Sequence, residues 1–591
     1  QAPSPRKDIR DCSADPLYLP PTATNTSVRL AALRGVMRTQ GTHAYIVPST
    51  DAHMSEYISE RDARLGWLTG FSGSAGEGIP QPSSAALWRT GSATQLSPAA
   101  SIESIGMWIL KEVPVGGNVT LDPFLFSIDT WNSYSRALHG SGRTLLPLET
   151  NLVDQAWGDQ RPLPSSSEIY SLPAEFTGSS WQEKVAGIRQ QMEEHSRRPT
   201  AVLLSGLEET AWLFNLRGDD IPYNPVFYSY TLLTNTTISL FMDESRLSAV
   251  ARASLLSGCP GLLCVELQEY GQVSAHLRRY TQDNVTVWLG TEYTTYGLYS
   301  IIPQEKLLEE NYSPVMTAKA VKNAHEQEML RAAHVRDAVA VIQYLLWLEK
   351  TVPQGQVDEF SGAQHIDALR WSEHSRGPSF QSISASGLNA ALAHYSPSNG
   401  SSRALSVREM YLFDTGGQYL CGCQTQNVES FARRALWNVG LNYGHGTGHG
   451  IGNFLSVHEW TGGSPGYSWP SEPGYYRDGE FGIRIEDVAL VVEAQTEETF
   501  LTFEVVSLVP YDRKLIDLSL LSPEQIQYLN SYYEKIRAQV GPELRRQRLE
   551  EEYAWLQEST EPFPLSSART VALAPLALAP LLSVLLSGLG A

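Results

Sequence analysis

The pattern of hydrophobic and polar positions predicts two similar α/β blocks in the first half of the chain. Residues 28–37 have apolar side chains at helical spacing and precede the short apolar run 44–47, which is typical of a buried strand. Residues 181–195 and 201–204 repeat this order of amphipathic helix and buried strand. The Pro-rich stretch 161–164 indicates a linker between the blocks.

The second half carries longer helical patterns and then an apolar segment. A long helix is predicted within residues 319–352, with its start at Asn-Ala-His-Glu-Gln, and a charged helix over 531–557. Residues 571–591 are apolar and uncharged. We therefore expect an N-terminal α/β domain, a second α/β domain, a third domain, a stalk and a hydrophobic segment, at residues 1–160, 161–315, 316–545, 546–570 and 571–591.

Composition is typical of a large globular protein. The 591 residues are 42% hydrophobic and 18% charged, which is enough apolar material for several cores. The net charge of −20 argues against nucleic acid as a partner, because phosphate backbones attract basic surfaces. The sequence also has no Gly-rich phosphate loop and no basic tract.

One stretch of the third domain concentrates metal-ligating residue types. A run that reads Gly-His-Gly-Thr-Gly-His-Gly-Ile-Gly contains His445 and His449, and it is followed by His458, Glu472 and Glu486. Imidazole nitrogens and carboxylate oxygens suit a borderline or hard divalent metal. Glycines let the backbone approach a bound substrate closely. Packing alone does not explain this accumulation, so we predict a metal site.

These residues resemble the catalytic domain of the aminopeptidase P (Xaa-Pro aminopeptidase) family, in its membrane-bound form, within the pita-bread metallopeptidases. The resemblance extends to residues 208–217, 382–397 and 501–507 and covers nearly the whole chain. It implies two creatinase/prolidase-type α/β domains followed by a pita-bread catalytic domain. In that fold, helices pack against a curved antiparallel sheet whose concave face carries the ligands.

The resemblance implies a dinuclear centre with five protein ligands. Four of them match Asp414, His449, Glu472 and Glu486, with Glu486 bridging the two ions. The second aspartate of the family, which also bridges the ions, is replaced by Thr425. We therefore expect zinc or manganese, with two ions per chain in the family and one or none here.

The segment around this position also differs from the family. The connection to the His-Gly-Thr-Gly-His run is shortened, as are residues 461–469 and 78–106. A degenerate paralogue, a splice form and an incomplete gene model all remain open. Cys421 and Cys423 lie beside the missing ligand and are either a source of a thiolate ligand, which favours zinc, or ordinary or oxidised residues.

The implied activity is removal of an N-terminal residue that precedes proline. Proline's tertiary amide lacks an N–H and has a fixed φ, so general peptidases handle it poorly. By resemblance, Glu472 shuttles the proton, and His458 and His394 stabilise the tetrahedral oxyanion or the substrate. His445 and Arg484 support substrate binding and the orientation of the ligands.

Two other functions remain open. A catalytically impaired pseudopeptidase that acts as a cell-surface binding protein is favoured by Thr425. A metal-independent pita-bread hydrolase such as creatinase is disfavoured, because four ligands are retained.

The sequence also predicts a location on the extracellular face of the plasma membrane. The apolar segment 571–591 contains prolines and follows small residues, which fits a glycosylphosphatidylinositol attachment signal with Ser566 as the attachment point. Glycosylation sequons occur at Asn25, Asn118, Asn235, Asn284, Asn311 and Asn399.

The five cysteines are consistent with an oxidising compartment. Cys259 and Cys264 can close a short loop and form the predicted disulfide. Cys421 and Cys423 are too close in sequence for an easy bridge, and Cys12 is left free or intermolecular. The expected partners are X-Pro peptides, the membrane through a glycolipid and a second copy of the chain in a homo-oligomer.

Overall fold

The computed structural model describes residues 24–71, 76–82, 84–89, 104–256, 261–371, 375–400, 402–419, 432–433, 436–459, 467–496 and 500–565. The chain forms two compact units. One comprises residues 1–333 and 355–506, and the other comprises 334–354 and 507–591. The first unit contains both N-terminal domains and the sheets that carry the predicted ligands.

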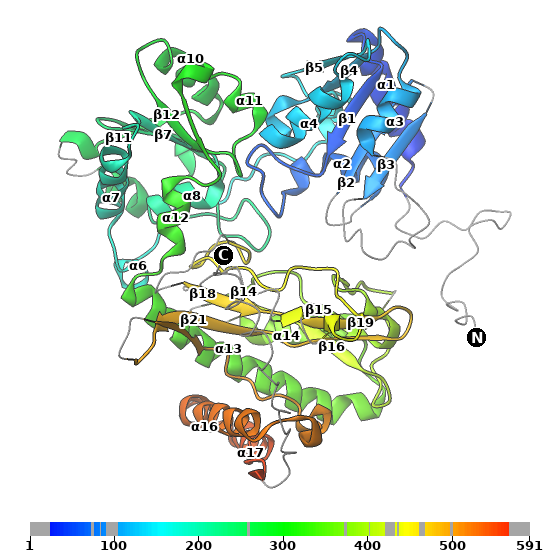
Figure 1. The fold of residues 1–591 in the computed structure, drawn as a ribbon, viewed down its shortest axis with the longest axis vertical. Helices are drawn as coiled ribbons and strands as arrows, with labels where there is room; N and C mark the ends of the chain where they lie inside the picture. Colours follow the sequence, from blue (N-terminus) through cyan, green and yellow to red (C-terminus); the bar gives the residue numbers. More distant parts are fainter. Residues whose placement is uncertain are drawn as a thin grey trace, which may run out of the picture. The chain divides into compact units, whose positions relative to one another are not determined.

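The first domain is a five-stranded sheet with helices around it, as its pattern predicts (Figure 1). The strand order is β3-β2-β1-β4-β5, with β1, β4 and β5 parallel and β2 antiparallel to β1. Every residue of β1 is buried. The strands are β1 (Ala44–Pro48), β2 (Gly76–Pro80), β3 (Ala85–Arg89), β4 (Asn118–Leu121) and β5 (Thr144–Pro147). The helices are α1 (Thr26–Thr39), α2 (Arg64–Thr69), α3 (Ile105–Glu112), α4 (Ile128–Leu138) and α5 (Leu152–Trp157).

The second domain repeats the α/β plan with six strands in the order β11-β10-β9-β7-β12-β13. Its first long helix begins with a capping box between Ser180 and Glu183 and supplies apolar residues to the largest core cluster. The strands are β7 (Ala201–Leu204), β9 (Tyr230–Thr234), β10 (Ile238–Phe241), β11 (Val265–Gln268), β12 (Val287–Gly290) and β13 (Leu307–Glu310), with the small pair β6 (Tyr170–Ser171) and β8 (Leu216–Arg217). The helices are α6 (Ala174–Thr177), α7 (Trp181–Glu194), α8 (Leu207–Leu213), α9 (Ala249–Leu256), α10 (Val273–Tyr280), α11 (Tyr296–Tyr299) and α12 (Pro314–Ala320).

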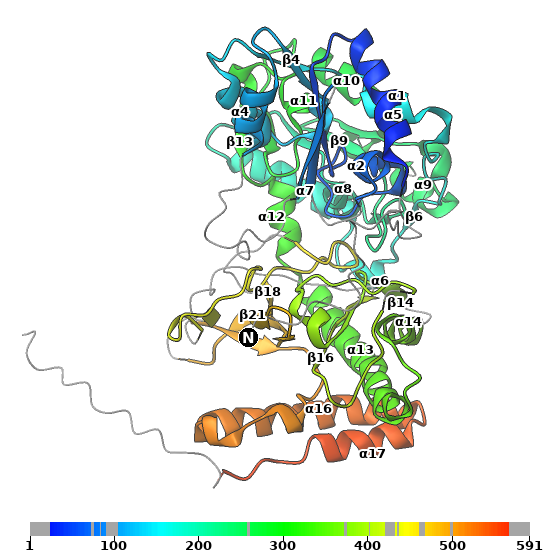
Figure 2. The same ribbon diagram turned by 90° about the vertical axis from the view of Figure 1, so that its right-hand side faces the viewer.

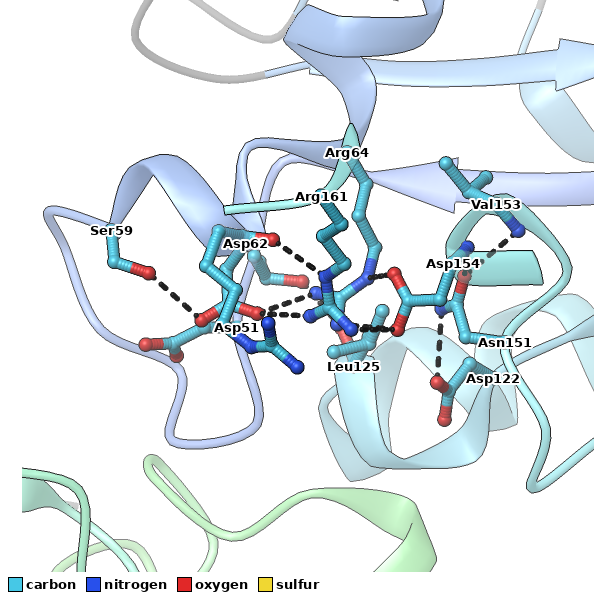
Figure 3. Close-up of polar contacts among 12 residues, drawn as sticks. Asp51, Ser59, Asp62, Arg64, Asp122, Leu125, Asn151, Val153, Asp154 and Arg161 are labelled. Atoms are coloured by element: carbon cyan, nitrogen blue, oxygen red, sulfur yellow. Dashed lines mark hydrogen bonds and ion pairs between the residues drawn. The ribbon is translucent and has the colours of Figure 1, made fainter. Parts of the chain in front are cut away.

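A buried polar network stabilises the first domain (Figure 3). Arg64 makes a bidentate pair with Asp154, at 2.8 and 3.0 Å, and Arg161 contacts the same carboxylate at 2.6 Å. Both arginines also reach Asp62. The hydroxyl of Tyr228 donates to Asp62 at 2.6 Å, so the network extends to the second domain.

The third domain contains only antiparallel strand pairs among its described residues. This is the sheet type expected for the pita-bread fold. The helices are α13 (Ala324–Thr351) and α14 (Glu359–Arg370). The strands are β14 (Ser375–Pro378), β15 (Ile383–Ser386), β16 (Tyr411–Asp414), β17 (Gly417–Tyr419), β18 (Ser468–Ser471), β19 (Gly474–Arg477), β20 (Phe481–Arg484), β21 (Asp487–Glu493) and β22 (Leu501–Val505).

The charged helix predicted over 531–557 is instead two helices, α16 (Pro523–Arg546) and α17 (Glu550–Ser559), which lie side by side (Figure 2). Arg548 adopts φ 62°, a left-handed conformation that ends α16 and turns the chain. Leu556 of α17 is fully buried. Part of the predicted stalk is therefore folded and packed.

The predicted anchor and most cysteines lie outside the described residues. This holds for the segment 571–591 and Ser566, and for Cys12, Cys259, Cys421 and Cys423. Cys264 is disulfide-bonded, and its pairing with Cys259 stays a prediction. Among the described residues, no helix combines the length and the apolar character that crossing a bilayer requires.

The six sequons differ in accessibility. The asparagine side chains are exposed at Asn25, Asn235, Asn284, Asn311 and Asn399. Asn118, at the start of β4, is half-buried, and its Nδ2 donates to the carbonyl oxygen of Gly41 at 3.2 Å.

Candidate metal centre

Three carboxylates of the predicted site are positioned by strand ends of the third domain. Asp414 is the last residue of β16 and pairs with Ile383 of β15. Glu472 directly follows β18, and Glu486 lies between β20 and β21. Strand ends place side chains more rigidly than long loops do, so the three positions are well defined.

His449 lies between two isolated backbone bridges. Gly448 pairs with Ser471, next to Glu472, and Gly450 pairs with Glu459, next to His458. The glycine-rich run is thus tied on one side to the strand that leads to a predicted ligand. On the other side it is tied to the segment that carries His458.

The carboxylates are close enough to perturb one another. Burial and the charge of Asp414 raise the pKa of Glu472 to about 7. Surrounding protein atoms reduce the hydration of the Glu486 carboxylate, and this raises its pKa well above the usual value. The charges of Asp414 and Glu472 raise it further. Like charges gathered in this way favour either proton uptake or a cation between them.

Arg484 supplies a positive charge within this group. Its Nη2 donates to Oδ2 of Asp414 at 2.6 Å, and its Nε lies 3.9 Å from Oε2 of Glu472. Its Nη1 donates to the Tyr476 hydroxyl at 2.5 Å. That hydroxyl in turn lies 2.9 Å from Nε2 of His445. Arg484 and His445 therefore belong to one hydrogen-bonded chain, as expected for residues that orient the site.

The protonation of His449 suits a metal ligand. Its Nδ1 lies 2.7 Å from the carbonyl oxygen of Gly450, so Nδ1 carries the proton and donates it. Its Nε2 keeps a lone pair and lies 3.8 Å from Oε1 of Glu472. Removal from water, together with the charge of His458, lowers the pKa of His449 to about 3. The ring is therefore neutral at physiological pH.

His458 carries a charge more readily than its neighbour. Its ring stands edge-on to that of His449, with centroids 4.1 Å apart. Nearby protein atoms disfavour the charged ring of His458, but the hydrogen bond and charge of Glu56 outweigh this and raise its pKa. His394 is exposed and lies near enough to His458 and Arg484 to be affected by their charges.

The donor set fits a divalent cation in its chemistry. Asp414, Glu472 and Glu486 offer carboxylate oxygens, and His449 offers a neutral nitrogen, which are ligands that zinc and manganese accept. No three His, Cys, Asp or Glu side chains in the described part of the chain stand close enough together to enclose an ion. Arg484 supplies the positive charge nearest to Asp414 and Glu472 among their ion pairs.

The structure brings most of the sequence-predicted residues together. Each of the following contacts or electrostatically affects at least one other member of the set: Asp414, His449, Glu472, Glu486, His445, His458, Arg484 and His394. Thr425, the position of the missing aspartate, lies outside the described residues. Their individual roles stay predictions.

Sequence reasoning missed two partners of these residues. Tyr476 links Arg484 to His445. It lies four residues after Glu472 in a Tyr-Tyr pair, and this proximity in sequence could have marked it as a site residue. Glu56 comes from the first domain, and nothing local in the sequence points to it.

Known protein families match the chain in three parts. The model of the creatinase/prolidase N-terminal domain matches residues 160–326, that of metallopeptidase family M24 matches 328–426 and 421–493, and that of the C-terminal region of peptidase M24 matches 499–563. The chain is 54% identical to Xaa-Pro aminopeptidase 2 of Rattus norvegicus, over 98% of this chain and 95% of that protein. This chain belongs to the Xaa-Pro aminopeptidases of family M24.

Other comparisons agree with this family. Xaa-Pro aminopeptidase 2 of Homo sapiens is 52% identical over 98% of the chain and 95% of that protein. The crystal structure of X-prolyl aminopeptidase from Caenorhabditis elegans, described as a cytosolic enzyme with a di-nuclear active site, superposes with a TM-score of 0.83. Its identity is 30%, over 92% of this chain and 100% of that one. The predicted family, fold class and metallopeptidase character are confirmed.

The comparisons also locate the departure from the family. The alignment with the Rattus norvegicus protein runs over 641 positions, more than the 591 residues of this chain, so that relative carries residues that this chain lacks. The family M24 model matches in two pieces that meet at residues 421–426, the stretch that contains Thr425. The shortening expected at this position stays a prediction.

Proposed function

We propose that this chain is a metal-dependent exopeptidase that removes the N-terminal residue from peptides with proline in the second position. The observation that carries the proposal is the electrostatic coupling of Asp414, Glu472 and Glu486, with Nε2 of the neutral His449 3.8 Å from Glu472. The relatives that are 52–54% identical are Xaa-Pro aminopeptidases by name, which supports the same substrate class.

The site residues have separate tasks in this reaction. Glu472, with a pKa of about 7, can accept and release a proton at its carboxylate near neutral pH, as a general acid–base group must. His458, whose pKa is raised by Glu56, donates a hydrogen bond to the oxygen of the scissile carbonyl as charge develops there. His394 and His445 stand beside it and contact the substrate backbone.

Asp414, His449, Glu472 and Glu486 would hold the metal, for which we propose zinc or manganese. When bound, the ion polarises the scissile carbonyl as a Lewis acid. The residue at the second-aspartate position is Thr425, so we propose at most one tightly held ion per chain. The Caenorhabditis elegans relative is described as di-nuclear, which makes metal stoichiometry a direct point of comparison.

A second function is a catalytically impaired protein that binds peptides at the cell surface. It is favoured by Thr425 and by the pairing of Arg484 with Asp414, which satisfies a ligand carboxylate without a metal. Binding of an X-Pro peptide without its cleavage would support this function over the first.

One experiment decides between the two functions. The purified chain is dialysed, its zinc and manganese are quantified, and release of the first residue from an X-Pro-Pro peptide is measured with and without a chelator. We expect slow cleavage that the chelator abolishes, none of an X-Ala-Pro control, and none by Glu472→Gln. Cleavage that survives removal of all metal contradicts the metallopeptidase proposal.

We further propose that the protein lies on the extracellular face of the plasma membrane, held by a glycolipid at Ser566. The exposed sequons and the apolar segment 571–591 after small residues support this location. Phosphatidylinositol-specific phospholipase C should release the protein from intact cells. Retention of the protein with the apolar segment still detectable by mass spectrometry contradicts the anchor.

A further inference from the structure

The segment that carries His458 is seated in the core of the second domain. Leu455 belongs to the largest hydrophobic cluster, whose other members lie between residues 169 and 315. Phe454 is buried and has φ 49°, which a residue with a side chain adopts only when its surroundings enforce it. Arg217 of β8 enforces it, since its guanidinium donates to the carbonyl oxygens of Phe454 at 2.7 Å and Asn453 at 2.9 Å.

Glu459, the residue after His458, is the second anchor of this segment. Its carboxylate pairs with the ammonium groups of Lys319, in α12, and Lys322, with 2.7 Å between Nζ of Lys322 and Oε2. All three side chains are at most 1% exposed. A carboxylate buried this completely between two ammonium groups has one available position.

The backbone of Glu459 connects this anchor to the metal centre. Its N–H donates to the carbonyl oxygen of Gly450 at 2.9 Å, and the N–H of Gly450 donates back at 3.2 Å. The two bonds join the residues directly after His449 and His458. They therefore fix the edge-on contact of the two rings, whose centroids are 4.1 Å apart.

We propose that Glu459, clamped by Lys319 and Lys322, is a positioning residue for peptide cleavage: it sets the distance between His449 and His458. This inference deepens the proposed function and rests on it for its kinetic consequences. The second domain is then part of the catalytic apparatus, because Lys319 lies in its last helix and Arg217 in its small strand pair.

The test compares two carboxylates that are each held by two cations. Glu459→Gln removes the charge of the proposed clamp, and Asp154→Asn does the same in the first-domain network, far from either histidine along the chain. For each variant, kcat and KM on an X-Pro-Pro peptide are measured, with the thermal midpoint and amide hydrogen exchange of the metal-free protein.

We expect Glu459→Gln to lower kcat by roughly 10- to 100-fold with KM nearly unchanged, because small displacements of catalytic groups have effects of this size. Exchange at the amides of Gly450 and Glu459 should accelerate at least about 10-fold in the same variant, since their pairing loosens. Asp154→Asn should lower the thermal midpoint but leave kcat and these amides as in the wild type.

A double variant separates positioning from stability. Adding Lys322→Met to Glu459→Gln removes one of the two buried ammonium groups that faced the lost negative charge, so the thermal midpoint should partly recover while kcat stays low. Recovery of kcat together with the midpoint, or an equal loss of kcat in Asp154→Asn, overturns the proposal. If Glu459→Gln does not fold, the double variant alone decides in the same way.

The two proposals fail differently. A wild-type protein that binds metal and cleaves no X-Pro peptide contradicts the proposed function. The exchange rates at Gly450 and Glu459 in Glu459→Gln still decide the positioning role in that case, since wild-type rates there overturn it without any activity being measured.

Discussion

Two carboxylates in this molecule are each held between two cations, and the cations differ. Asp154 of the first domain contacts Arg64 and Arg161. Glu459 of the third domain contacts Lys319 and Lys322. In the arginine network both arginines also contact Asp62 (Figure 3), whereas both lysines contact the same carboxylate, that of Glu459.

The difference follows from the chemistry of the two cations. A guanidinium stays charged in proteins and presents a planar fork, which suits the bidentate contact between Arg64 and Asp154. An ammonium group can lose its proton when it is buried, and burial lowers the pKa of Lys319 to about 7. The first network therefore keeps its charges, whereas the second can lose a positive charge at Lys319.

The largest effect on stability is expected in the arginine network. Asp154→Asn leaves two arginines that cannot lose their protons, so we expect a loss of about 3–5 kcal/mol in the free energy of unfolding. Urea denaturation followed by tryptophan fluorescence measures it. Arg252→Met, which removes the exposed partner of Glu244, is the matched control and should cost less than about 1 kcal/mol. A loss as small as that of the control contradicts the comparison.

Glu459→Gln should be less destabilising, at about 1–3 kcal/mol, because Lys319 can release its proton when the carboxylate charge is gone. The same denaturation experiment at pH 7 and pH 9 checks this explanation. The deficit relative to the wild type should shrink at pH 9. A deficit that is constant with pH would mean that neither lysine adjusts its charge.

The wild type itself should show the titration of Lys319. Its pKa is lowered to about 7 in the folded protein by burial, whereas an unfolded lysine titrates near 10.4. Between these values the unfolded chain binds more protons, so stability rises with pH, by up to about 1.4 kcal/mol from pH 7 to pH 8. Lys319→Met should flatten this rise, and Lys350→Met, at an exposed pair with Glu551, should not. Parallel curves for all three proteins contradict the prediction.

The smallest effect is expected at Glu56, which holds His458 from the solvent side. Both side chains of this pair are more than 40% exposed, at 48% and 41%, and exposed pairs contribute at most about 1 kcal/mol. Glu56→Gln should change kcat by less than about 5-fold. It should also shift the loss of the His458 proton to lower pH, because Glu56 raises that pKa. A pH–rate profile that does not move would remove Glu56 from this role.

The sequence predicted the local elements better than it predicted the long-range contacts that support the candidate ligands. Compact sequence motifs contain the four candidate ligands, so they can be proposed from neighbouring residues alone. These are Asp414, His449, Glu472 and Glu486. The clamp on Glu459 joins positions 137 residues apart, between Lys322 and Glu459. Such contacts depend on how domains pack, which hydrophobic periodicity does not encode.

Helix boundaries show the same limit on a smaller scale. The strand Ala201–Leu204 was predicted with the correct first and last residues, because a short apolar run between polar residues is typical of a buried strand. The single helix predicted over 531–557 is two helices in the structure. The turn between them depends on the left-handed conformation of Arg548, which the local sequence does not indicate. The difference at Thr425 was predicted from the sequence, and residues 420–431 lie outside the described part of the chain.

Because of the hydrogen bond from Asn118 to Gly41, the proposed glycosylation of Asn118 depends on when it occurs relative to folding. Five sequon side chains remain open to solvent after folding, whereas the amide of Asn118 is already engaged. We expect a sugar to be attached there more readily before β1 and β4 pair. Since N-terminal domains fold while synthesis continues, occupancy at Asn118 records whether the transferase acts faster than the first domain closes.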